Sequence, residues 1–537
     1  MENLKIPSTL MTQHPDACRY VPVQEEPQEA IFSLTPPPEG LGLEEAMVDF
    51  EGKLTPYLQT SQIVLGLLSK GIIPGREIFV TPRIPSGREE GVFRQLMALM
   101  SIVESNYHAW KQSQTYAVRE VILPMCTGTE ELLSVRERVI DIINLAHKEF
   151  GLSKDPNTIQ LIPLVETIPQ ILEVESILGS YLAGCRDMGL TTERLRFMLG
   201  RSDLALSYGM VPAILANKIA LAQGHRIQEK TGVAIAPIVG GGTLPFRGHF
   251  TLENVENTLR EYGGTRTLTV QSAMRYDHGY DKTRRLAATL KERLPSTSPS
   301  RLDDETQSLL LNIIGIFVKH YLWSFQAMIE PMCKISDLIP QQRDRLARIS
   351  EVGYARDLPH PRELADLITD SDLAKELRKL QPKKAAELPR AISYTAALYN
   401  IGLPPEIIGT GRGIEEVRER YGESALRKFL DYYVGLKADM SFACRFVNLK
   451  NASEFLPASV ISQADEDLKF IRENTGITPG PQSKEDRFYA TILETMKPML
   501  KNIVGLEGKE ILSDERTEYD LVKEWMLKLG KMRGGLG

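Results

Sequence analysis

The sequence has few of the features that mark secreted, membrane or nucleic-acid-binding proteins. Its 537 residues include only five cysteines, which are far apart and form no C-x-x-C pair. This pattern argues against a disulfide scaffold or a zinc ribbon and fits a reducing compartment. Lysine and arginine number 64 against 70 aspartates and glutamates, a net charge of −6, and no basic block is interleaved with aromatic residues. We therefore expect no nucleic-acid partner.

Long apolar runs are also missing. The most apolar stretch, residues 309–318, is interrupted by Asn312 and is too short to cross a bilayer. The first residues contain no apolar segment of the signal-peptide type. We therefore expect a cytoplasmic protein without a membrane partner. The remaining composition, 42% hydrophobic and 25% charged, is that of a globular chain and excludes disorder as its main state.

Short β-prone runs alternate with longer segments of helical periodicity over the first half of the chain. Most of these runs are almost continuously apolar, as in strands buried on both faces of a parallel sheet. There are eight of them: residues 10–14, 46–50, 77–83, 120–126, 159–166, 195–203, 233–239 and 267–275. Segments between them, such as residues 92–108 and 168–183, are long enough to form crossover helices. Eight strands close a barrel, so the sequence predicts an α/β fold, a (β/α)8 barrel of TIM type, over residues 1–295.

Helical periodicity dominates the second half of the chain. It is clearest in residues 306–328, 361–380, 414–436 and 487–504. The segment LPSTSP, residues 294–299, marks the boundary with the barrel. Residues 296–537 are therefore predicted to form a mainly α-helical region that packs on the barrel and contributes to contacts between subunits.

Two acidic residues close neighbouring strands of the predicted barrel. Glu166 ends the fifth apolar run and Asp203 ends the sixth. Active sites of such barrels lie at the carboxyl ends of the strands, so both carboxylates are expected at one rim. Such a pair suits one Mg²⁺ or Mn²⁺ ion, which prefers oxygen ligands and keeps positions for water and substrate. Alternatively, each carboxylate caps the helix that follows it.

Arginines gather at the same rim. Arg83, Arg247 and Arg275 lie at the ends of predicted strands or in the loops after them. The planar guanidinium binds carboxylates and phosphates through two parallel hydrogen bonds, so convergence of these residues predicts a small, multiply anionic substrate. A single arginine is more often a surface or ion-pair residue, and this alternative stays open for each one.

Arg247 belongs to a glycine-rich segment, GGGTLPFRGHF, over residues 240–250. Gly241 and Gly242 permit backbone turns that other residues resist. The segment matches neither glycine fingerprint of nucleotide-binding proteins. We expect a mobile phosphate-binding or lid loop, and the alternative is a glycine-rich turn without a catalytic role.

His14 lies in the segment TQHPD, where Pro15 ends the predicted first strand. Histidine is the side chain whose ordinary pKa allows proton transfer near pH 7. A buried structural histidine is the alternative. His14 is therefore a candidate for proton transfer at the rim.

These segments together resemble the phosphoenolpyruvate carboxylases, specifically their short archaeal-type form. The resemblance spans nearly the whole chain and is carried by MTQHPDA, VTPRIPSG, IPLVETIPQ, RSDLALSYGMVPAILANKIAL, GGGTLPFRGHF, TVQSAMRYD, TAALYNIGLPPEIIGTG and KMRGGLG. It implies a barrel enzyme, usually a tetramer, that joins bicarbonate to phosphoenolpyruvate with Mg²⁺ or Mn²⁺. The products would be oxaloacetate and inorganic phosphate, formed through carboxyphosphate and the enolate of pyruvate.

The resemblance also implies roles for single residues. The long bacterial and plant branch has T-A-H-P-T around its catalytic histidine, matched at His14. Its metal ligands lie in P-L-F-E-T and G-Y-S-D-S-A-K, matched at Glu166 and at Asp203, although Leu206 replaces the lysine of the second motif. Arg83 and Arg275 match strand-end arginines of both branches.

The catalytic glycine loop of the long branch, H-G-R-G-G-S-I-G-R-G-G, is matched only in part. Arg247 corresponds to its second arginine, and nothing in residues 239–243 replaces its first histidine and arginine. Arg201, which stands only in this version of the aspartate motif, is our candidate for the missing charge. The resemblance thus implies that the catalytic residues are His14, Arg83 and Arg247. The predicted substrate-binding residues are Arg83, Arg201, Arg247, Arg275, Gly241 and Gly242.

Two other functions remain open at this point. Other metal-dependent barrels that form enolates use a similar pair of carboxylates, and the large helical half is also compatible with a non-catalytic assembly protein. Metal-dependent consumption of phosphoenolpyruvate with bicarbonate would separate the three possibilities. The end of the sequence, residues 531–537, resembles the M-R-N-T-G end of the long branch and is expected to pack near the barrel rim.

Overall fold

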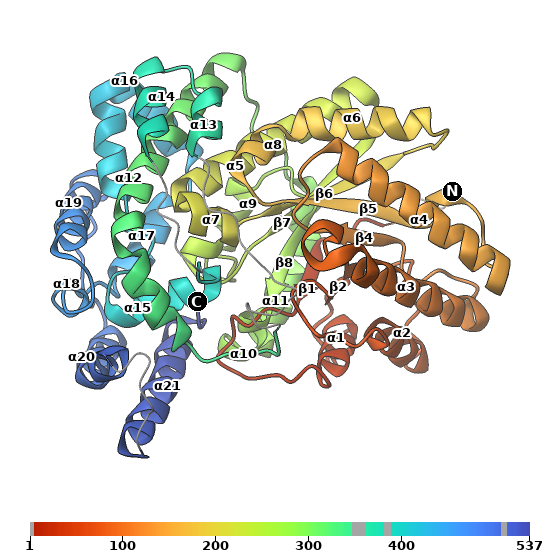
Figure 1. The fold of residues 1–537 in the computed structure, drawn as a ribbon, viewed down its shortest axis with the longest axis horizontal. Coiled ribbons are helices and arrows are strands. Elements are labelled where there is room, and N and C mark those ends of the chain that lie inside the picture. Colours follow the sequence, from red (N-terminus) through yellow and green to blue (C-terminus); the bar gives the residue numbers. More distant parts are fainter. Residues whose placement is uncertain (1–4, 346–360, 381–387, 506–512) are drawn as a thin grey trace.

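A computed structural model describes residues 5–345, 361–380, 388–505 and 513–537 (Figure 1). Eight parallel strands follow one another around a closed barrel, and β8 pairs with β1 to complete it. The strands are β1 (Thr9–Thr12), β2 (Glu45–Asp49), β3 (Phe79–Arg83), β4 (Glu120–Leu123), β5 (Gln160–Val165), β6 (Arg194–Gly200), β7 (Ala234–Gly240) and β8 (Thr267–Gln271). Each lies largely or wholly within one of the eight predicted runs, so the predicted (β/α)8 barrel is confirmed.

Helices cover the outside of the barrel. They are α1 (Glu26–Leu34), α2 (Gln59–Ser69), α3 (Val92–Ser113), α4 (Thr129–Phe150), α5 (Ile168–Leu172), α6 (Val174–Asp187), α7 (Ser202–Tyr208), α8 (Met210–Thr231), α9 (Val255–Glu261), α10 (Ser272–Asp277) and α11 (Tyr280–Arg293). The helix predicted over residues 168–183 is divided into α5 and α6 at Glu173. The strands predicted over residues 195–203 and 267–275 end at Gly200 and Gln271, because α7 and α10 begin almost directly after β6 and β8.

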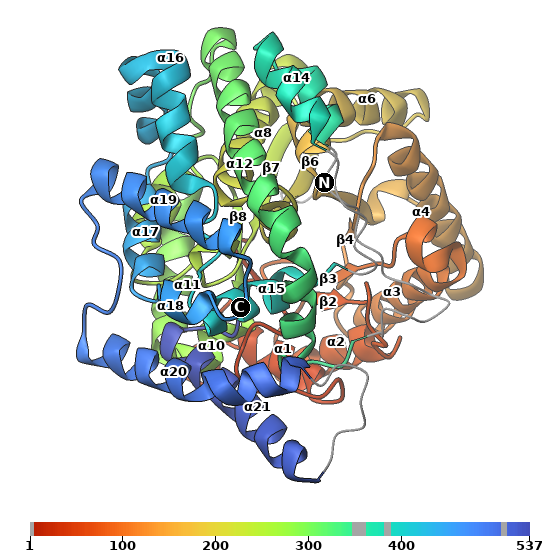
Figure 2. The ribbon, with the colours of Figure 1, turned by 60° about the vertical axis from the view of Figure 1, so that its left-hand side comes forward.

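The second half of the described chain is helical, as predicted. Its helices are α12 (Asp304–Asp337), α13 (Pro361–Leu367), α14 (Ser371–Lys379), α15 (Ala391–Ile401), α16 (Thr410–Tyr432), α17 (Leu436–Cys444), α18 (Leu449–Ala452), α19 (Ala458–Thr475), α20 (Lys484–Gly505) and α21 (Ser513–Arg533). They gather beside the barrel in both views (Figures 1 and 2).

The long helix α12 forms the centre of the helical region. By length and composition it could cross a membrane, but 72% of its most apolar window is buried inside the protein. Asn312, which interrupts the apolar run, accepts hydrogen bonds from the main-chain N–H groups of Thr369 and Asp370, both at 3.1 Å. α12 packs against α8 of the barrel and against α16, so it has the environment of a core helix.

The two ends of the barrel differ in chemistry. Apolar side chains fill its interior: Leu10, Met47, Ile122, Ile162, Leu164, Met198 and Ile238. At the end where the strands begin, the buried Arg196 forms ion pairs with Glu45 (2.7 Å) and Glu120 (2.8 Å). This ion cluster closes one end, and the opposite end, where the strands finish, is available for chemistry.

The helical region reaches this opposite end of the barrel. α15 packs against α7, and the end of the chain lies beside α15 in both views (Figures 1 and 2). The buried carboxylate of Glu406, just after α15, accepts a hydrogen bond from the main-chain N–H of Phe246 at 2.8 Å. The helical region therefore contacts the glycine-rich segment that follows β7.

Candidate active site

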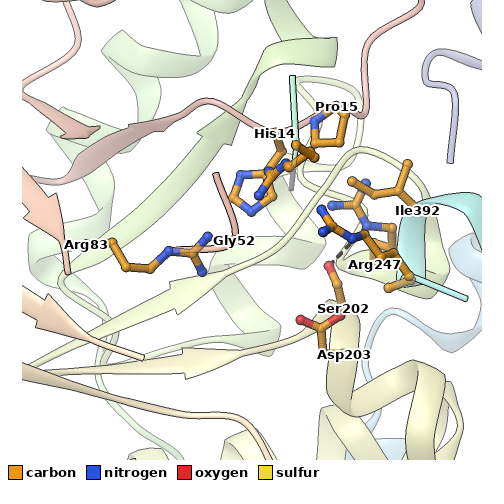
Figure 3. A pocket seen from close by; sticks show the side chains of 11 residues that line it. His14, Pro15, Gly52, Arg83, Ser202, Asp203, Arg247 and Ile392 are labelled. Carbon is orange, nitrogen blue, oxygen red and sulfur yellow. Dashed lines mark hydrogen bonds between the residues drawn. The ribbon is translucent and has the colours of Figure 1, made fainter. Parts of the chain in front are cut away.

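A cavity lies at the carboxyl ends of the strands (Figure 3). Its lining residues are His14, Pro15, Gly52, Arg83, Ser202, Asp203, Arg247, Arg345, Arg390, Ala391 and Ile392. The structure thus brings together four residues that the sequence singled out, His14, Arg83, Asp203 and Arg247. The last four lining residues come from the helical half, where the sequence analysis placed no site residue.

Arg83 is held by two carboxylates at the rim. Its Nε and Nη2 donate to the two oxygens of Asp49, both at 2.8 Å, and its Nη1 lies 2.7 Å from Glu51. Burial lowers the pKa of Arg83, but Asp49 and Glu51 outweigh burial and raise it well above its ordinary value. For Asp49, burial alone would raise the pKa, but the neighbouring charge of Arg83 outweighs burial and holds the pKa well below its usual range. Both groups are therefore charged, and the guanidinium is fixed in orientation.

Arg247 is almost fully buried, with 1% of its surface exposed. Its Nε donates to the hydroxyl of Ser202 at 3.1 Å, and its Nη2 donates to Gln271 at 2.7 Å. Its Nη1 donates to the main-chain oxygen of Gly537. The hydrogen bonds of Arg247 thus connect its loop to β8, to the first turn of α7 and to the last residue of the sequence. Figure 3 shows the bond to Ser202.

Gly241 and Gly242 do not line the cavity, and they make room for Arg247. A Cβ on Gly242 would lie 2.8 Å from Oε1 of Gln271 and 3.0 Å from Cζ of Arg247, and one on Gly241 would lie 2.7 Å from the carbonyl oxygen of Arg247. The whole segment from Gly241 to Arg247 is buried. The glycine-rich loop is therefore packed against the protein at the carboxyl ends of the strands.

His14 lies at the cavity with a neutral imidazole. Burial lowers its pKa well below the ordinary value, and the charges of Arg83 and Arg345 lower it further, while Asp49 acts in the opposite direction. Its Nδ1 is buried and has no hydrogen-bond partner in the part of the chain that the structure describes. A neutral imidazole can accept a proton, as the predicted role requires.

Glu166 follows β5, and Asp203 lies in the first turn of α7. Glu166 accepts a hydrogen bond from the main-chain N–H of Met125 at 3.3 Å. A Cβ on Gly200 would come within 3.1 Å of Cγ of Glu166, so the glycine leaves room for this side chain. The N-cap residues are Thr167 for α5 and Arg201 for α7, so neither carboxylate stands at a helix N-cap position.

The donor set fits a hard divalent cation. Two carboxylates follow the neighbouring strands β5 and β6, and Asp203 lines the cavity. Within the described ranges there is no cluster of three or more His, Cys, Asp or Glu side chains placed to hold a metal. Mg²⁺ and Mn²⁺ need no such cluster, because they are commonly held by one or two carboxylates and keep waters or substrate oxygens in their other positions.

Arg201 and Arg275 lie away from the cavity lining. Arg201 is fully buried behind the glycine-rich loop, where it donates to the hydroxyl of Tyr262 and to the carbonyl oxygen of Phe246, both at 3.2 Å. Arg275 lies on α10, where it donates to the carbonyl oxygen of Glu29 at 3.2 Å. Its Nη1 is also 3.7 Å from the carboxylate of Glu29. A substrate contact for either arginine stays a prediction.

A closed (β/α)8 barrel with carboxylates and clustered arginines at its strand ends has the arrangement expected of a barrel enzyme. The family model described as phosphoenolpyruvate carboxylase matches residues 6–537. This chain belongs to that family.

Several phosphoenolpyruvate carboxylases are similar to this chain over its full length. The phosphoenolpyruvate carboxylase of Methanopyrus kandleri is 40% identical over 99% of both chains. That of Methanosarcina acetivorans is 38% identical, and that of Metallosphaera sedula 28% identical, again over 99% of each chain. Among solved structures, a Haloferax volcanii malate synthase lead(II) complex matches with a TM-score of 0.38 and 12% identity, over 80% of this chain and 99% of that chain. So weak a likeness carries no further inference.

Proposed function

We propose that this chain carboxylates phosphoenolpyruvate with bicarbonate and releases oxaloacetate and inorganic phosphate. The observation that carries the proposal is the match to phosphoenolpyruvate carboxylases over the whole chain, at up to 40% identity among the relatives above. The cavity is consistent with it. Phosphoenolpyruvate carries a carboxylate and a phosphate group with a charge of about −1.5 to −2 at pH 7, and four arginines line the cavity.

The proposed reaction has two parts. A bicarbonate oxygen attacks phosphorus and the bond from phosphorus to the enol oxygen breaks, which leaves carboxyphosphate and the enolate of pyruvate. Carboxyphosphate then loses a proton and divides into CO₂ and phosphate. The enolate carbon captures the CO₂, and the C–C bond of oxaloacetate forms.

His14 is the proposed acceptor of the carboxyphosphate proton. Its imidazole is neutral because burial, Arg83 and Arg345 all lower its pKa. An anionic substrate beside the same arginines offsets their charge, so we expect the pKa of His14 to rise when substrate binds. The base therefore becomes stronger at the stage at which it is needed.

Glu166 and Asp203 are the residues that would hold Mg²⁺ or Mn²⁺. When bound, the ion supplies Lewis-acid stabilisation of negative charge that develops on substrate oxygen. Arg247 adds positive charge beside Ser202 and Asp203, and the packed loop that carries it keeps water away from the reacting groups. Exclusion of water matters because a protonated enolate would be lost as pyruvate.

The deciding experiment is an assay of the purified protein with phosphoenolpyruvate, bicarbonate and Mg²⁺ or Mn²⁺. We expect equal amounts of oxaloacetate and inorganic phosphate, formed only when bicarbonate and metal are both present. Consumption of phosphoenolpyruvate without a need for bicarbonate would favour another enolate-forming barrel. No consumption under any of these conditions would favour a non-catalytic assembly protein.

We also propose a cytoplasmic homotetramer. The tetramer rests on the family resemblance, and the cytoplasm is supported by the cysteines, all five of which lie in described parts of the chain and form no disulfide bond there. Light scattering of the purified protein should give a mass close to four times 60.2 kDa. A monomeric mass at micromolar concentration would contradict the tetramer.

A further inference from the structure

The loop that carries Arg247 contains a buried histidine that takes no part in the proposed reaction steps. His249 follows Arg247 after a single glycine, and only 8% of its surface is exposed. It is not one of the residues that line the cavity of Figure 3. Its backbone has a φ of 58°, in the left-handed region that few residues with a side chain adopt. The contacts of this imidazole are therefore with the protein itself.

His249 is held by helix α17 of the helical half. Its Nδ1 donates to Oδ1 of Asp439 at 2.6 Å. Its ring lies edge-on against the ring of Phe442, with 5.3 Å between the centroids. The same helix packs against the short turn Pro245–Arg247. The helical half therefore contacts the loop directly beside Arg247.

Asp439 has a fixed position of its own. It is 5% exposed, and its Oδ2 accepts a hydrogen bond from the hydroxyl of Tyr433 at 2.6 Å. The main-chain N–H of Gly435, just before α17, donates to Glu261 of α9 at 2.8 Å. Glu261 is in turn paired with Lys218 of α8 at 2.8 Å. The start of α17 is thus fastened to two helices of the barrel, and the carboxylate that holds His249 is fixed with it.

Arg247 lies between two carboxylates that the helical half presents to the loop. On one side, Glu406 accepts from the main-chain N–H of Phe246 at 2.8 Å. On the other side, Asp439 accepts from His249. The first contact holds the main chain, and the second holds a side chain that has no other role in the reaction. Substitution of His249 can therefore release one flank of the loop without changing Arg247 itself.

We propose that Asp439 and His249 are positioning residues, whose hydrogen bond keeps the Arg247 loop closed over the cavity while the enolate is present. The proposal rests on the proposed function. In a closed cavity the enolate carbon captures CO₂. In an open one it takes a proton from water, which leaves pyruvate and hydroxide, while phosphate is formed in either case. The contact between Asp439 and His249 would therefore set the ratio of oxaloacetate to pyruvate.

The test compares His249→Ala and His249→Asn with the parent enzyme. His249→Ala removes the donor, and we expect kcat for oxaloacetate to fall by about tenfold, the size of one hydrogen bond to a charged group. Pyruvate should rise as a share of the products, and the KM for phosphoenolpyruvate should change less than kcat. His249→Asn should be close to the parent, because its amide nitrogen is as far from Cβ as Nδ1 is and asparagine tolerates a positive φ.

Two control variants separate positioning from stability. His225→Ala removes an exposed histidine on α8 that lies 3.3 Å from Glu229, and it should behave like the parent. Val139→Ala removes two methyl groups from the buried face of α4, so it should lower the Tm and leave the product ratio unchanged. A destabilised fold alone should therefore release no additional pyruvate.

Hydrogen exchange of the loop amides tests the same contact without an activity assay. The N–H of Gly242 donates to the carbonyl oxygen of Arg247 at 2.8 Å, and that of Phe250 donates to the carbonyl oxygen of Gly242 at 2.9 Å. Exchange over residues 240–250, measured by mass spectrometry, should be about tenfold faster in His249→Ala than in the parent. It should stay at the parental rate in His225→Ala and Val139→Ala.

A parental product ratio in folded His249→Ala would overturn the proposal, as would an equal loss of oxaloacetate and pyruvate. Parental exchange over residues 240–250 in this variant would show that Asp439 does not hold the loop closed. If the parent fails to carboxylate phosphoenolpyruvate, the proposed function is wrong. Faster exchange in His249→Ala alone would then still support the contact with Asp439 as the one that holds the loop.

Discussion

Arg247 donates a hydrogen bond to the main-chain oxygen of Gly537, a residue 290 positions further along the sequence. Two more contacts hold the same tail. The hydroxyl of Thr243 donates to the carbonyl oxygen of Gly534 at 2.9 Å, and the N–H of Leu536 donates to the carbonyl oxygen of Asp16 at 2.7 Å. The tail therefore contacts both the loop that carries Arg247 and the segment that follows His14. The sequence predicts such packing of residues 531–537 near the barrel rim.

Deletion of residues 534–537 should lower activity strongly while the fold is kept. Arg247 and Thr243 would each lose an acceptor, so the loop would lose its position over the cavity. Steady-state rates together with circular dichroism measure this effect.

A single methyl group offers a milder version of the same test. A Cβ on Gly537 would collide with the carbonyl oxygen of Ile392, so Gly537→Ala should also reduce the rate. Gly179→Ala is the matched control, because a Cβ there meets nothing within 4 Å. A truncated enzyme with full activity would show that the tail has no part in holding Arg247.

The barrel, and the site residues that the barrel contributes, were predictable because both depend on local sequence patterns. Apolar runs mark the strands, and the residue at the end of a strand must reach the rim whatever else the chain does. For this reason His14, Arg83 and Asp203 were found at the cavity. The sequence predicts Arg201 there as well, as the candidate for the charge missing from the glycine loop. The helix α7 begins between Arg201 and Asp203, and Arg201 turns behind the loop to Tyr262.

Arg275 lies outside the cavity lining for a similar reason. Because β8 ends at Gln271, Arg275 lies on α10 and faces Glu29 of α1. Burial raises the pKa of Glu29, but Arg343 and Arg275 outweigh burial and bring it to about 2. Arg345 and Arg390 carry no local signal of a site, because only the packing of α12 and α15 against the barrel brings them to the cavity.

Asp203→Asn should remove most activity and leave the fold intact, because a neutral amide is a poorer ligand for a hard cation. A higher concentration of Mg²⁺ or Mn²⁺ should restore part of the rate. Metal titrations of both proteins measure this, with Asp281→Asn, an exposed aspartate on α11, as the control. An unchanged metal requirement in the variant would show that Asp203 is not a ligand.

His14→Asn should separate the two parts of the reaction. Attack of bicarbonate on phosphorus needs no base at this position, whereas breakdown of carboxyphosphate does. We therefore expect phosphate release to persist while oxaloacetate formation is lost, as measured by parallel assays of both products. His147→Asn on α4, where the imidazole contacts the carbonyl oxygen of Leu152, is the control. Full carboxylation by His14→Asn would exclude the proposed proton acceptor.

Arg247→Lys should lower kcat by at least about tenfold. Lysine keeps the charge, but its single ammonium group cannot reproduce the fixed fork that joins Ser202, Gln271 and Gly537. Arg226→Lys, in an ion pair with Glu175 between α8 and α6, should behave like the parent. If only the KM rises and kcat is unchanged, Arg247 contributes equal binding to substrate and transition state.

Glu406 should make stability depend on pH, because its carboxylate is fully buried where it holds the loop of Arg247. One oxygen accepts from Phe246 N–H and from the hydroxyl of Tyr399, and the other has no partner within the described residues. Burial raises its pKa from 4.5 to about 7. Between these values the folded protein binds more protons than the unfolded chain, so stability falls as pH rises, by at most about 3 kcal/mol.

Glu406→Gln keeps the accepting oxygen and removes the titration, so the two proteins should diverge with pH. We expect the Tm of the parent to fall relative to that of Glu406→Gln from pH 5 to pH 8, and the difference to stay constant at higher pH. Glu305→Gln, at a 90% exposed side chain on α12, should follow the parent throughout. Thermal unfolding of the three proteins in matched buffers decides the matter. If the Tm of the parent and the Tm of Glu406→Gln change with pH in parallel, Glu406 has the same charge in the folded and unfolded chains over this range. The loop would then be held by a permanently ionised carboxylate.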